Sequence, residues 1–237
     1  DKSDEIDLAF FINGIPVATV ELKTDFTQSV EAAMQQYRMD RPPQRKSGGL
    51  EPRLAFRRGA VVHFAMSDSD IRMATKLAGD ATFFLPFNRG NDGAAGNPPA
   101  EDGGYPVSYF WERVLQKDNW LHIFHRFVLL ERKEVQDASG KTSYKEALIF
   151  PRFHQWEGVT RMIDAVRVEG VGQPYLIQHS AGSGKTNTIA WTAHSLIRVR
   201  RPDGEPYFHS VIVVTDRQVL DQQLQDAIQQ IEHQAGV

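Results

Sequence analysis

Residues 179–186 read His-Ser-Ala-Gly-Ser-Gly-Lys-Thr, and they are the most informative stretch of the chain. They lie between the apolar run Tyr175-Leu176-Ile177 and a stretch in which apolar residues recur at helical spacing. A strand, a glycine-rich loop and a helix in this order are typical of a phosphate-binding loop, because backbone N–H groups and the helix N-terminus converge on phosphate oxygens. His179 stands where the full motif has a glycine, so a glycine-rich turn without a ligand is the alternative.

Each part of this loop has an expected role in binding a nucleotide. Gly182 and Gly184 let the backbone curl around the phosphates. Lys185 would reach the β- and γ-phosphates, and the Thr186 hydroxyl would ligate Mg²⁺. The expected nucleotide-binding residues of the loop are Ser180, Ala181, Gly182, Ser183, Gly184, Lys185 and Thr186.

The residues that follow the loop predict an α/β fold. Apolar side chains repeat at helical spacing and define an inner helix face, namely Ile189, Ala193, Leu196 and Ile197. Residues 211–214 are a continuous β-branched run, as expected for a strand buried on both faces. With residues 175–177 as the first strand, the order predicts a right-handed βαβ unit of a doubly wound parallel sheet.

A second chemical signal lies near the start of the chain. Two apolar runs flank Asn13-Gly14, which is a strong β-hairpin signal. Because side chains alternate along strands, Asp7, Glu21 and Lys23 are expected to converge at the open end of this hairpin. Asp7 and Glu21 could hold Mg²⁺, which polarises a phosphodiester and activates a water, while Lys23 positions that water or stabilises negative charge.

Two alternatives to this catalytic site stay open. The charged side chains of the hairpin could simply form a face exposed to solvent. The Glu-x-Lys spacing also recurs at Glu131-Arg132-Lys133, with Asp118 upstream. No hairpin joins Asp118 to Glu131, however, so the sequence does not predict that these side chains converge.

The composition is that of a globular protein, with 41% hydrophobic residues and a formal net charge of −3. Because there is no overall basic excess, any surface that binds nucleic acid must be local. The absence of cysteine excludes disulfides and thiolate metal sites. The chain begins at Asp1 without a signal peptide or membrane span, so we expect an internal piece of a longer cytoplasmic protein that has no membrane partner.

Two further segments have a distinctive composition. Residues 88–104 are rich in Gly, Asn, Pro, Ala and Asp, which predicts a flexible surface loop. Residues 38–58 carry seven Arg or Lys and only two acidic side chains. This basic segment could grip DNA phosphates or could be an ordinary solvated loop.

The motifs together resemble the restriction (motor) subunit of type I restriction–modification enzymes. The resemblance rests on Asp7 with Glu21-Leu22-Lys23, on Gln155, and on the loop at 179–186. It implies a PD-(D/E)xK-type endonuclease domain at residues 1–148 and the first part of a RecA-like, superfamily 2 domain at residues 149–237. It also implies ATP and Mg²⁺ as cofactors, double-stranded DNA as substrate, and modification and specificity subunits as partners.

The resemblance also assigns roles to single residues outside the two main motifs. Gln155 corresponds to a glutamine that reads adenine through an amide able to donate and accept hydrogen bonds. Arg217 would contact a DNA phosphate, with an ion pair to Asp216 or Asp221 as the alternative. Tyr37 would contact DNA, although Ala33 stands where the accompanying motif has glutamine, and Tyr37 could instead be part of the core.

Three functions remain compatible with the sequence. The first is ATP-dependent DNA translocation coupled to Mg²⁺-dependent endonucleolytic cleavage, the activity of a type I deoxyribonuclease. The second is a helicase-type ATPase with a noncatalytic N-terminal DNA-binding module. The third is a nucleotide-regulated assembly subunit without DNA chemistry.

Overall fold

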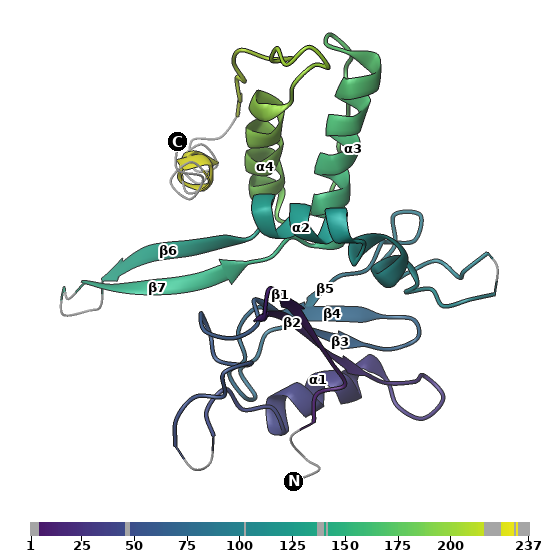
Figure 1. Ribbon diagram of the computed structural model, residues 1–237, viewed down its shortest axis with the longest axis vertical. Coiled ribbons are helices and arrows are strands. Elements are labelled where there is room, and N and C mark those ends of the chain that lie inside the picture. Colours follow the sequence, from purple (N-terminus) through teal and green to yellow (C-terminus); the bar gives the residue numbers. More distant parts are fainter. Residues whose placement is uncertain are drawn as a thin grey trace. The chain divides into compact units, whose positions relative to one another are not determined.

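The structure is a computed structural model that describes residues 5–45, 48–101, 103–136, 140, 142–215, 224–229 and 231. It contains two compact units (Figure 1). Unit 1 comprises Asp1–Phe124 and Leu130–Arg152, and unit 2 comprises His125–Leu129 and Phe153–Val237. The second unit therefore includes a short segment from the middle of the chain that the sequence did not indicate. Within the described residues, no helix combines the length and hydropathy that a membrane span requires.

A five-stranded mixed sheet forms the centre of unit 1, in the order β1-β2-β3-β4-β5. Its strands are β1 (Leu8–Ile12), β2 (Ile15–Leu22), β3 (Val62–Met66), β4 (Ile71–Ala74) and β5 (Leu85–Pro86). Strands β2 and β3 are parallel, and the other neighbouring pairs are antiparallel. Asn13 and Gly14 join β1 to β2 with φ angles of 50° and 80°, as a two-residue hairpin turn requires, so the hairpin prediction is confirmed.

Helix α1 (Val30–Met39) covers one face of this sheet and contacts β2, β3 and β4 (Figure 1). Its buried residues Val30, Ala33 and Tyr37 face the sheet. Strand β2 is consequently buried on both faces, and the Glu21 side chain is 0% exposed. The alternative of a solvated hairpin face is therefore wrong for Glu21. The sequence left this open because alternation along a strand separates its two faces. It does not show which face a helix later in the chain will cover.

A buried polar network connects α1 to the sheet. The Thr19 hydroxyl lies 2.9 Å from the Tyr37 hydroxyl and 2.7 Å from Nδ1 of His63. All three side chains are buried, and burial lowers the pKa of His63 to about 3, so this imidazole is neutral. Tyr37 is thus a core residue, which corrects the expectation that it contacts DNA: its position in the helical pattern was compatible with either role.

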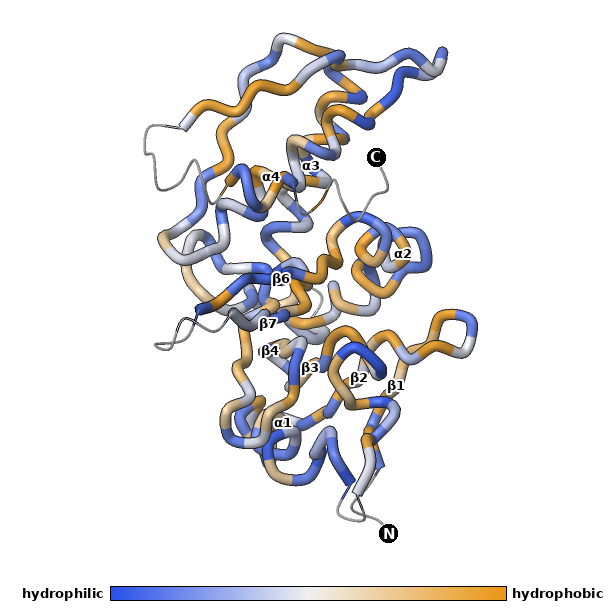
Figure 2. The backbone as a smooth tube through the Cα atoms, turned by 90° about the vertical axis from the view of Figure 1, so that its left-hand side faces the viewer, coloured by the Kyte–Doolittle hydropathy of each residue, from blue (hydrophilic) through white to orange (hydrophobic). Residues whose placement is uncertain are grey.

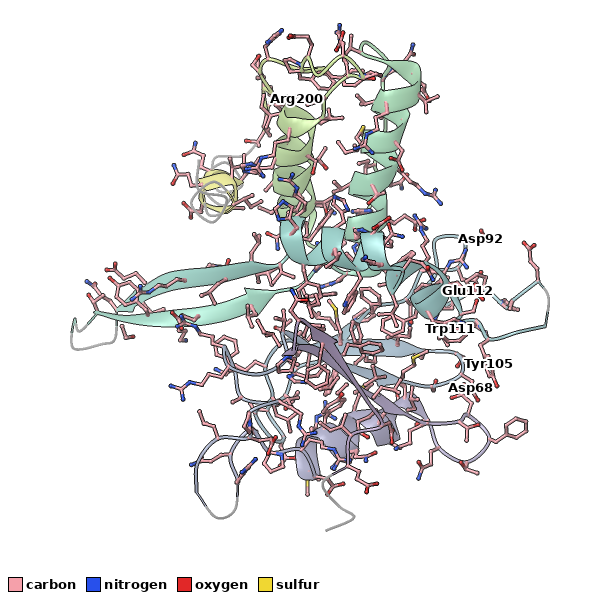
Figure 3. All side chains as sticks on the ribbon, viewed as in Figure 1. Asp68, Asp92, Tyr105, Trp111, Glu112 and Arg200 are labelled. Carbon is pink, nitrogen blue, oxygen red and sulfur yellow. The ribbon has the colours of Figure 1, made fainter. Side chains whose placement is uncertain are left out.

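Aromatic side chains fill the opposite face of the sheet. Phe64 of β3 packs edge-on against Phe110 and Phe87, with ring centroids 4.8 and 5.3 Å apart. Phe150 packs against Phe64 at 5.9 Å and closes the cluster. Tyr105 and Trp111 are among the aromatic residues outside this core, since both are exposed, and they contact each other at the edge of unit 1 (Figure 3).

Further elements surround this cluster. They are a single π-helical turn (Phe110–Val114), α2 (Lys117–Arg126), β6 (Leu129–Gln136) and β7 (Thr142–Ile149). Strands β6 and β7 form a separate two-stranded sheet, much of which is hydrophilic (Figure 2). The segment 88–104, of which residue 102 is not described, contains no helix or named strand. Its Asn97 side chain donates to the Ser69 carbonyl at 2.9 Å and accepts from the Arg89 N–H at 2.9 Å, which attaches the segment to the β3–β4 connection.

Two helices dominate the described part of unit 2. Helices α3 (Phe153–Glu169) and α4 (Lys185–Arg198) pack against each other, and Trp191 of α4 contacts Phe127 with ring centroids 5.4 Å apart. The residues predicted as strands, 175–177 and 211–214, form no strand, and neither segment pairs with another among the described residues. Leu176 and Val214 are 88% and 87% exposed.

The described part of unit 2 therefore contains no parallel sheet. A strand that is buried on both faces needs neighbouring strands and covering helices, and an apolar run shows only that it can be buried. Helix α4 has two apolar faces: Ala190 and Trp191 are buried in the unit, whereas Ile189 and Leu196 face residues 211–214 across a cavity of about 370 Å³. The predicted inner face of the helix is thus the face toward the predicted strand.

The buried network gives a prediction for Tyr37. Replacing Tyr37 by Phe should lower the free energy of unfolding by about 1 kcal/mol, because one buried hydrogen bond is lost while Thr19 keeps His63 as a partner. Urea denaturation measures this change. An unchanged stability combined with weaker DNA binding by the intact protein would instead assign Tyr37 to DNA recognition.

Candidate functional site

The hairpin brings Asp7 and Glu21 together. Asp7 immediately precedes β1, and its Oδ2 accepts a hydrogen bond of 2.7 Å from the backbone N–H of Leu22. This contact anchors the Asp7 carboxylate beside the end of β2, where Glu21 lies. Lys23 follows β2 directly, and its backbone N–H donates to the Met66 carbonyl at 2.9 Å, which continues the pairing with β3. The sheet thus fixes the backbone of Glu21 and Lys23, and the Leu22 N–H holds the Asp7 carboxylate beside them.

The Glu21 carboxylate is held by Arg41, which follows α1. The Nε of Arg41 donates to Glu21 Oε1 at 2.6 Å, and the two side chains are 4% and 0% exposed. The other guanidinium nitrogens donate to backbone carbonyls, Nη1 to Asp40 at 3.3 Å and Nη2 to Glu5. Glu21 Oε2 is also buried, but it has no hydrogen-bond partner among the described residues. The sequence grouped Arg41 with a basic segment, and nothing in the spacing pointed to Glu21.

Burial raises the pKa of Glu21 from an ordinary 4.5 to about 7. The Arg41 hydrogen bond and charge oppose this rise, and the neighbouring Asp7 carboxylate adds to it. Desolvation disfavours the ionised form unless a cation compensates it. The site therefore contains a carboxylate that is poised between its two protonation states near neutral pH.

These carboxylates fit a magnesium ion. Glu21 Oε2 is an oxygen without a partner in the described structure, and the Asp7 carboxylate lies beside Glu21. The described residues contain no group of three or more His, Cys, Asp or Glu that could hold a metal. Two carboxylates suffice for Mg²⁺, however, because this ion usually keeps several waters and takes phosphate oxygens as further ligands.

The second Glu-x-Lys sequence lies in a different setting. Glu131 and Lys133 are on β6, where Glu131 Oε1 contacts Lys133 Nζ at 3.0 Å, and Lys133 is exposed. Asp118 is exposed in the first turn of α2. Glu131 therefore has an exposed cationic partner within its own strand, whereas Glu21 is buried against Arg41, and its Oε2 has no hydrogen-bond partner in the described part of the chain.

The loop at 179–186 has the backbone expected of a phosphate-binding loop. Gly182 and Gly184 have φ angles of 73° and 82°, in the left-handed region that favours glycine, and Gly184 caps the N-terminus of α4. A Cβ at Gly184 would lie 2.5 Å from Nε2 of Gln155, so this glycine is also needed for a close approach. Ser180, Ala181, Gly182 and Lys185 are exposed, while Ser183 is buried.

Two neighbouring residues of α3 support this loop. Gln155 Nε2 donates to the Gly184 carbonyl at 2.9 Å, and His154 Nε2 donates to the Ser183 carbonyl at 3.1 Å. The His154 ring also contacts the His179 ring, with centroids 4.8 Å apart. Gln155 was expected near the nucleotide, and its amide lies at the loop. His154 was missed, because a histidine at a helix start has no sequence signal for this role.

Lys185 bridges the start of the loop. Its Nζ donates to the His179 and Ser180 carbonyls at 2.9 and 2.7 Å, which places the ammonium group over the curl of the backbone. Thr186 lies in the first turn of α4. Arg217, with its alternative partners Asp216 and Asp221, lies outside the described residues.

Comparison with known proteins covers both units. Residues 1–82 match the family model for the type I restriction enzyme R protein N terminus, and residues 154–237 match the SWI2/SNF2 ATPase model. A curated relative, the type I restriction enzyme HindI endonuclease subunit of Haemophilus influenzae, is 24% identical over 227 residues. The chain resembles a type I restriction R subunit. The alignment covers 92% of the chain and 19% of the relative, and no solved structure matches.

The two sites fall into the two matched regions. Asp7, Glu21 and Lys23 lie within the part that matches the R protein N terminus. Gln155 and the loop at 179–186 lie within the part that matches the ATPase model. The chain therefore combines a region similar to the R protein N terminus with a region similar to the SWI2/SNF2 ATPase, and it spans about a fifth of the length of the restriction subunit that it matches.

The raised pKa of Glu21 gives a pH-dependent prediction. The folded protein holds the Glu21 proton more tightly than the unfolded chain, so this contribution to stability is complete below pH 4.5 and is lost as the pH rises through about 7. Glutamine does not titrate. As the pH rises from 5 to 8, the melting temperature of Glu21→Gln should therefore rise relative to that of the wild type.

Thermal denaturation in buffers without divalent cations measures this difference. The Glu131→Gln variant on the β6–β7 hairpin is the control for loss of a carboxylate. A melting-temperature difference between Glu21→Gln and the wild type that stays constant with pH would show that Glu21 is ionised throughout this range.

Proposed function

We propose that the chain carries the nuclease site and the nucleotide-binding start of the motor of a type I restriction subunit. In this proposal, ATP-driven translocation along double-stranded DNA is coupled to Mg²⁺-dependent endonucleolytic cleavage. The observation that carries it is the buried Glu21, whose Oε2 has no hydrogen-bond partner among the described residues and whose pKa the nearby Asp7 carboxylate helps to raise, in a region similar to the R protein N terminus.

At the nuclease site the sheet would supply the ligands and the charge. Asp7 and Glu21 would hold Mg²⁺, which in such sites polarises the phosphodiester and lowers the pKa of a bound water. Asp7 is kept in place by the Leu22 N–H, and Glu21 by Arg41. Lys23, directly after β2, would orient the attacking water and stabilise the negative charge that develops on the phosphate.

At the nucleotide site the loop would bind the phosphates of ATP. The left-handed Gly182 and Gly184 turn the backbone so that its N–H groups can converge on an anion, as in other phosphate-binding loops. Lys185 would exchange the two carbonyls that it now contacts for β- and γ-phosphate oxygens, and Thr186 would ligate Mg²⁺. Gln155 would read the adenine through its amide.

The second candidate is a helicase-type ATPase whose N-terminal region only binds DNA. Burying a carboxylate and leaving one of its oxygens unpaired costs folding free energy, and this cost is characteristic of sites that perform chemistry. A module that only binds DNA needs no such group. This argument favours the nuclease, and it likewise disfavours an assembly subunit without DNA chemistry.

As the restriction subunit of a type I system, the protein would work in the cytoplasm with modification and specificity subunits. The specificity subunit would select the DNA sequence. Neither unit of the described structure needs to recognise a base sequence for the two proposed reactions, because both act on phosphates.

A pair of variants tests the two sites separately. In the intact protein, Glu21→Ala should stop DNA cleavage by removing a metal ligand while ATP hydrolysis continues. Lys185→Ala should stop ATP hydrolysis by removing a charge directed at the phosphates. Mg²⁺-dependent cleavage of circular DNA and phosphate release are the two measurements, made in the assembled complex.

Glu131→Ala is the matched control, because it removes a Glu-x-Lys carboxylate that is paired with Lys133. It should cut DNA as the wild type does. Cleavage that survives Glu21→Ala but is lost in Glu131→Ala would move the nuclease to the β6–β7 hairpin.

Gln155 provides a separate test of the nucleotide site. If its amide reads adenine, Gln155→Ala should reduce the preference for ATP over GTP more than it weakens phosphate binding. Gln155 also donates to the Gly184 carbonyl, so its loss could loosen the loop. A loosened loop would lower the affinity for ATP and for GTP equally. Competition binding with ATP and GTP separates the two, and an equal loss would reject the role in base reading.

A further inference from the structure

We propose that Arg41 is the positioning residue of the nuclease site, which sets the distance between the Asp7 segment and the Glu21 carboxylate. This inference rests on the proposed nuclease function. Its basis is the way in which one buried guanidinium contacts three parts of unit 1: a carboxylate of β2, the chain before β1 and the end of α1.

The contacts of Arg41 explain how it could control this geometry. Its Nε binds Oε1 of Glu21, and Oε2, which has no hydrogen-bond partner among the described residues, is the candidate ligand atom. Its Nη2 binds the Glu5 carbonyl, two residues before Asp7. One rigid planar group thereby links the backbone that carries the first metal ligand to the side chain of the second.

The stability of the fold does not require this arrangement. A buried ion pair contributes little net stability compared with apolar residues of the same volume, because removing both charges from water is costly. The sheet and α1 already supply an apolar core at Val30, Ala33 and Leu54. An ion pair at this position is therefore better explained by the orientation of Glu21 than by a contribution to folding.

Electrostatics and geometry make opposite predictions for a metal ion at this site. A positive charge in contact with Glu21 repels a cation, so its removal alone would strengthen metal binding. If Arg41 positions the two ligands, its removal should weaken metal binding, because the carboxylate and the Glu5 segment lose their common anchor. Partners that orient metal ligands typically change metal affinity or activity about 10- to 100-fold when they are removed.

The decisive experiment compares Arg41→Met and Arg41→Lys with the wild type in the intact protein. Mn²⁺ binding is measured by calorimetry without DNA or nucleotide. The binding heat that the wild type shows and Glu21→Ala lacks is assigned to the nuclease site. Both Arg41 variants should bind Mn²⁺ about 10- to 100-fold more weakly and should need correspondingly more Mg²⁺ for DNA cleavage. Their ATP hydrolysis should be unchanged.

Arg38→Met is the matched control. Arg38 lies on α1, where its guanidinium contacts the Thr82 carbonyl and the Phe84 ring, so its removal reports the general cost of losing an arginine from this helix. This variant should keep wild-type Mn²⁺ affinity. Arg41→Lys keeps the charge, but a single ammonium cannot span the three acceptors, so it should resemble Arg41→Met.

Three results would overturn the inference. Tighter Mn²⁺ binding in Arg41→Met would show that Arg41 acts only as a competing charge. Full recovery in Arg41→Lys would show that charge alone is sufficient. Loss of Mn²⁺ affinity in Arg38→Met to the same extent would show a general effect on unit 1. Unchanged cleavage in Glu21→Ala would instead reject the proposed nuclease site itself, whatever the Arg41 variants do.

Discussion

The burial of the Glu21 carboxylate against Arg41 is the constraint on which the proposed site in unit 1 depends. A buried charge must be compensated, and the guanidinium at 2.6 Å compensates it only if α1 ends where Arg41 can reach β2. The parallel pairing of β2 with β3 places β2 inside the sheet, and α1 then covers the face that carries Thr19 and Glu21. The buried site is thus a consequence of the order of strands and of one helix.

The sequence predicted the local features and missed those that depend on contacts between distant residues. Asn13-Gly14 predicted the hairpin because its turn geometry is set by two residues alone. Gly182 and Gly184 likewise predicted the curl of the loop. The partnership of Glu21 with Arg41 spans 20 residues and depends on how α1 packs, so no periodicity in the sequence encodes it.

The same reasoning explains why the expected strands of unit 2 are unpaired among the described residues. Residues 175–177 and 211–214 have the composition of buried strands, but strand formation requires hydrogen-bonded neighbours, which the described residues do not provide. The loop at 179–186 nevertheless has left-handed Gly182 and Gly184, and His154 and Gln155 of α3 support it. A loop conformation can be set by nearby side chains even where the sheet beside it is not formed.

The proposed nuclease site requires Asp7 and Glu21 to hold a divalent cation. The most direct measurement replaces Mg²⁺ by Fe²⁺ in the intact protein, with ascorbate and peroxide, so that radicals generated at the metal cut the nearest polypeptide backbone. Mass spectrometry then locates the cuts. The account predicts scission at the backbone around Asp7 and Glu21, suppressed by excess Mg²⁺ and absent in Glu21→Ala. Scission around Glu131, or scission at Asp7 that persists in Glu21→Ala, would contradict it.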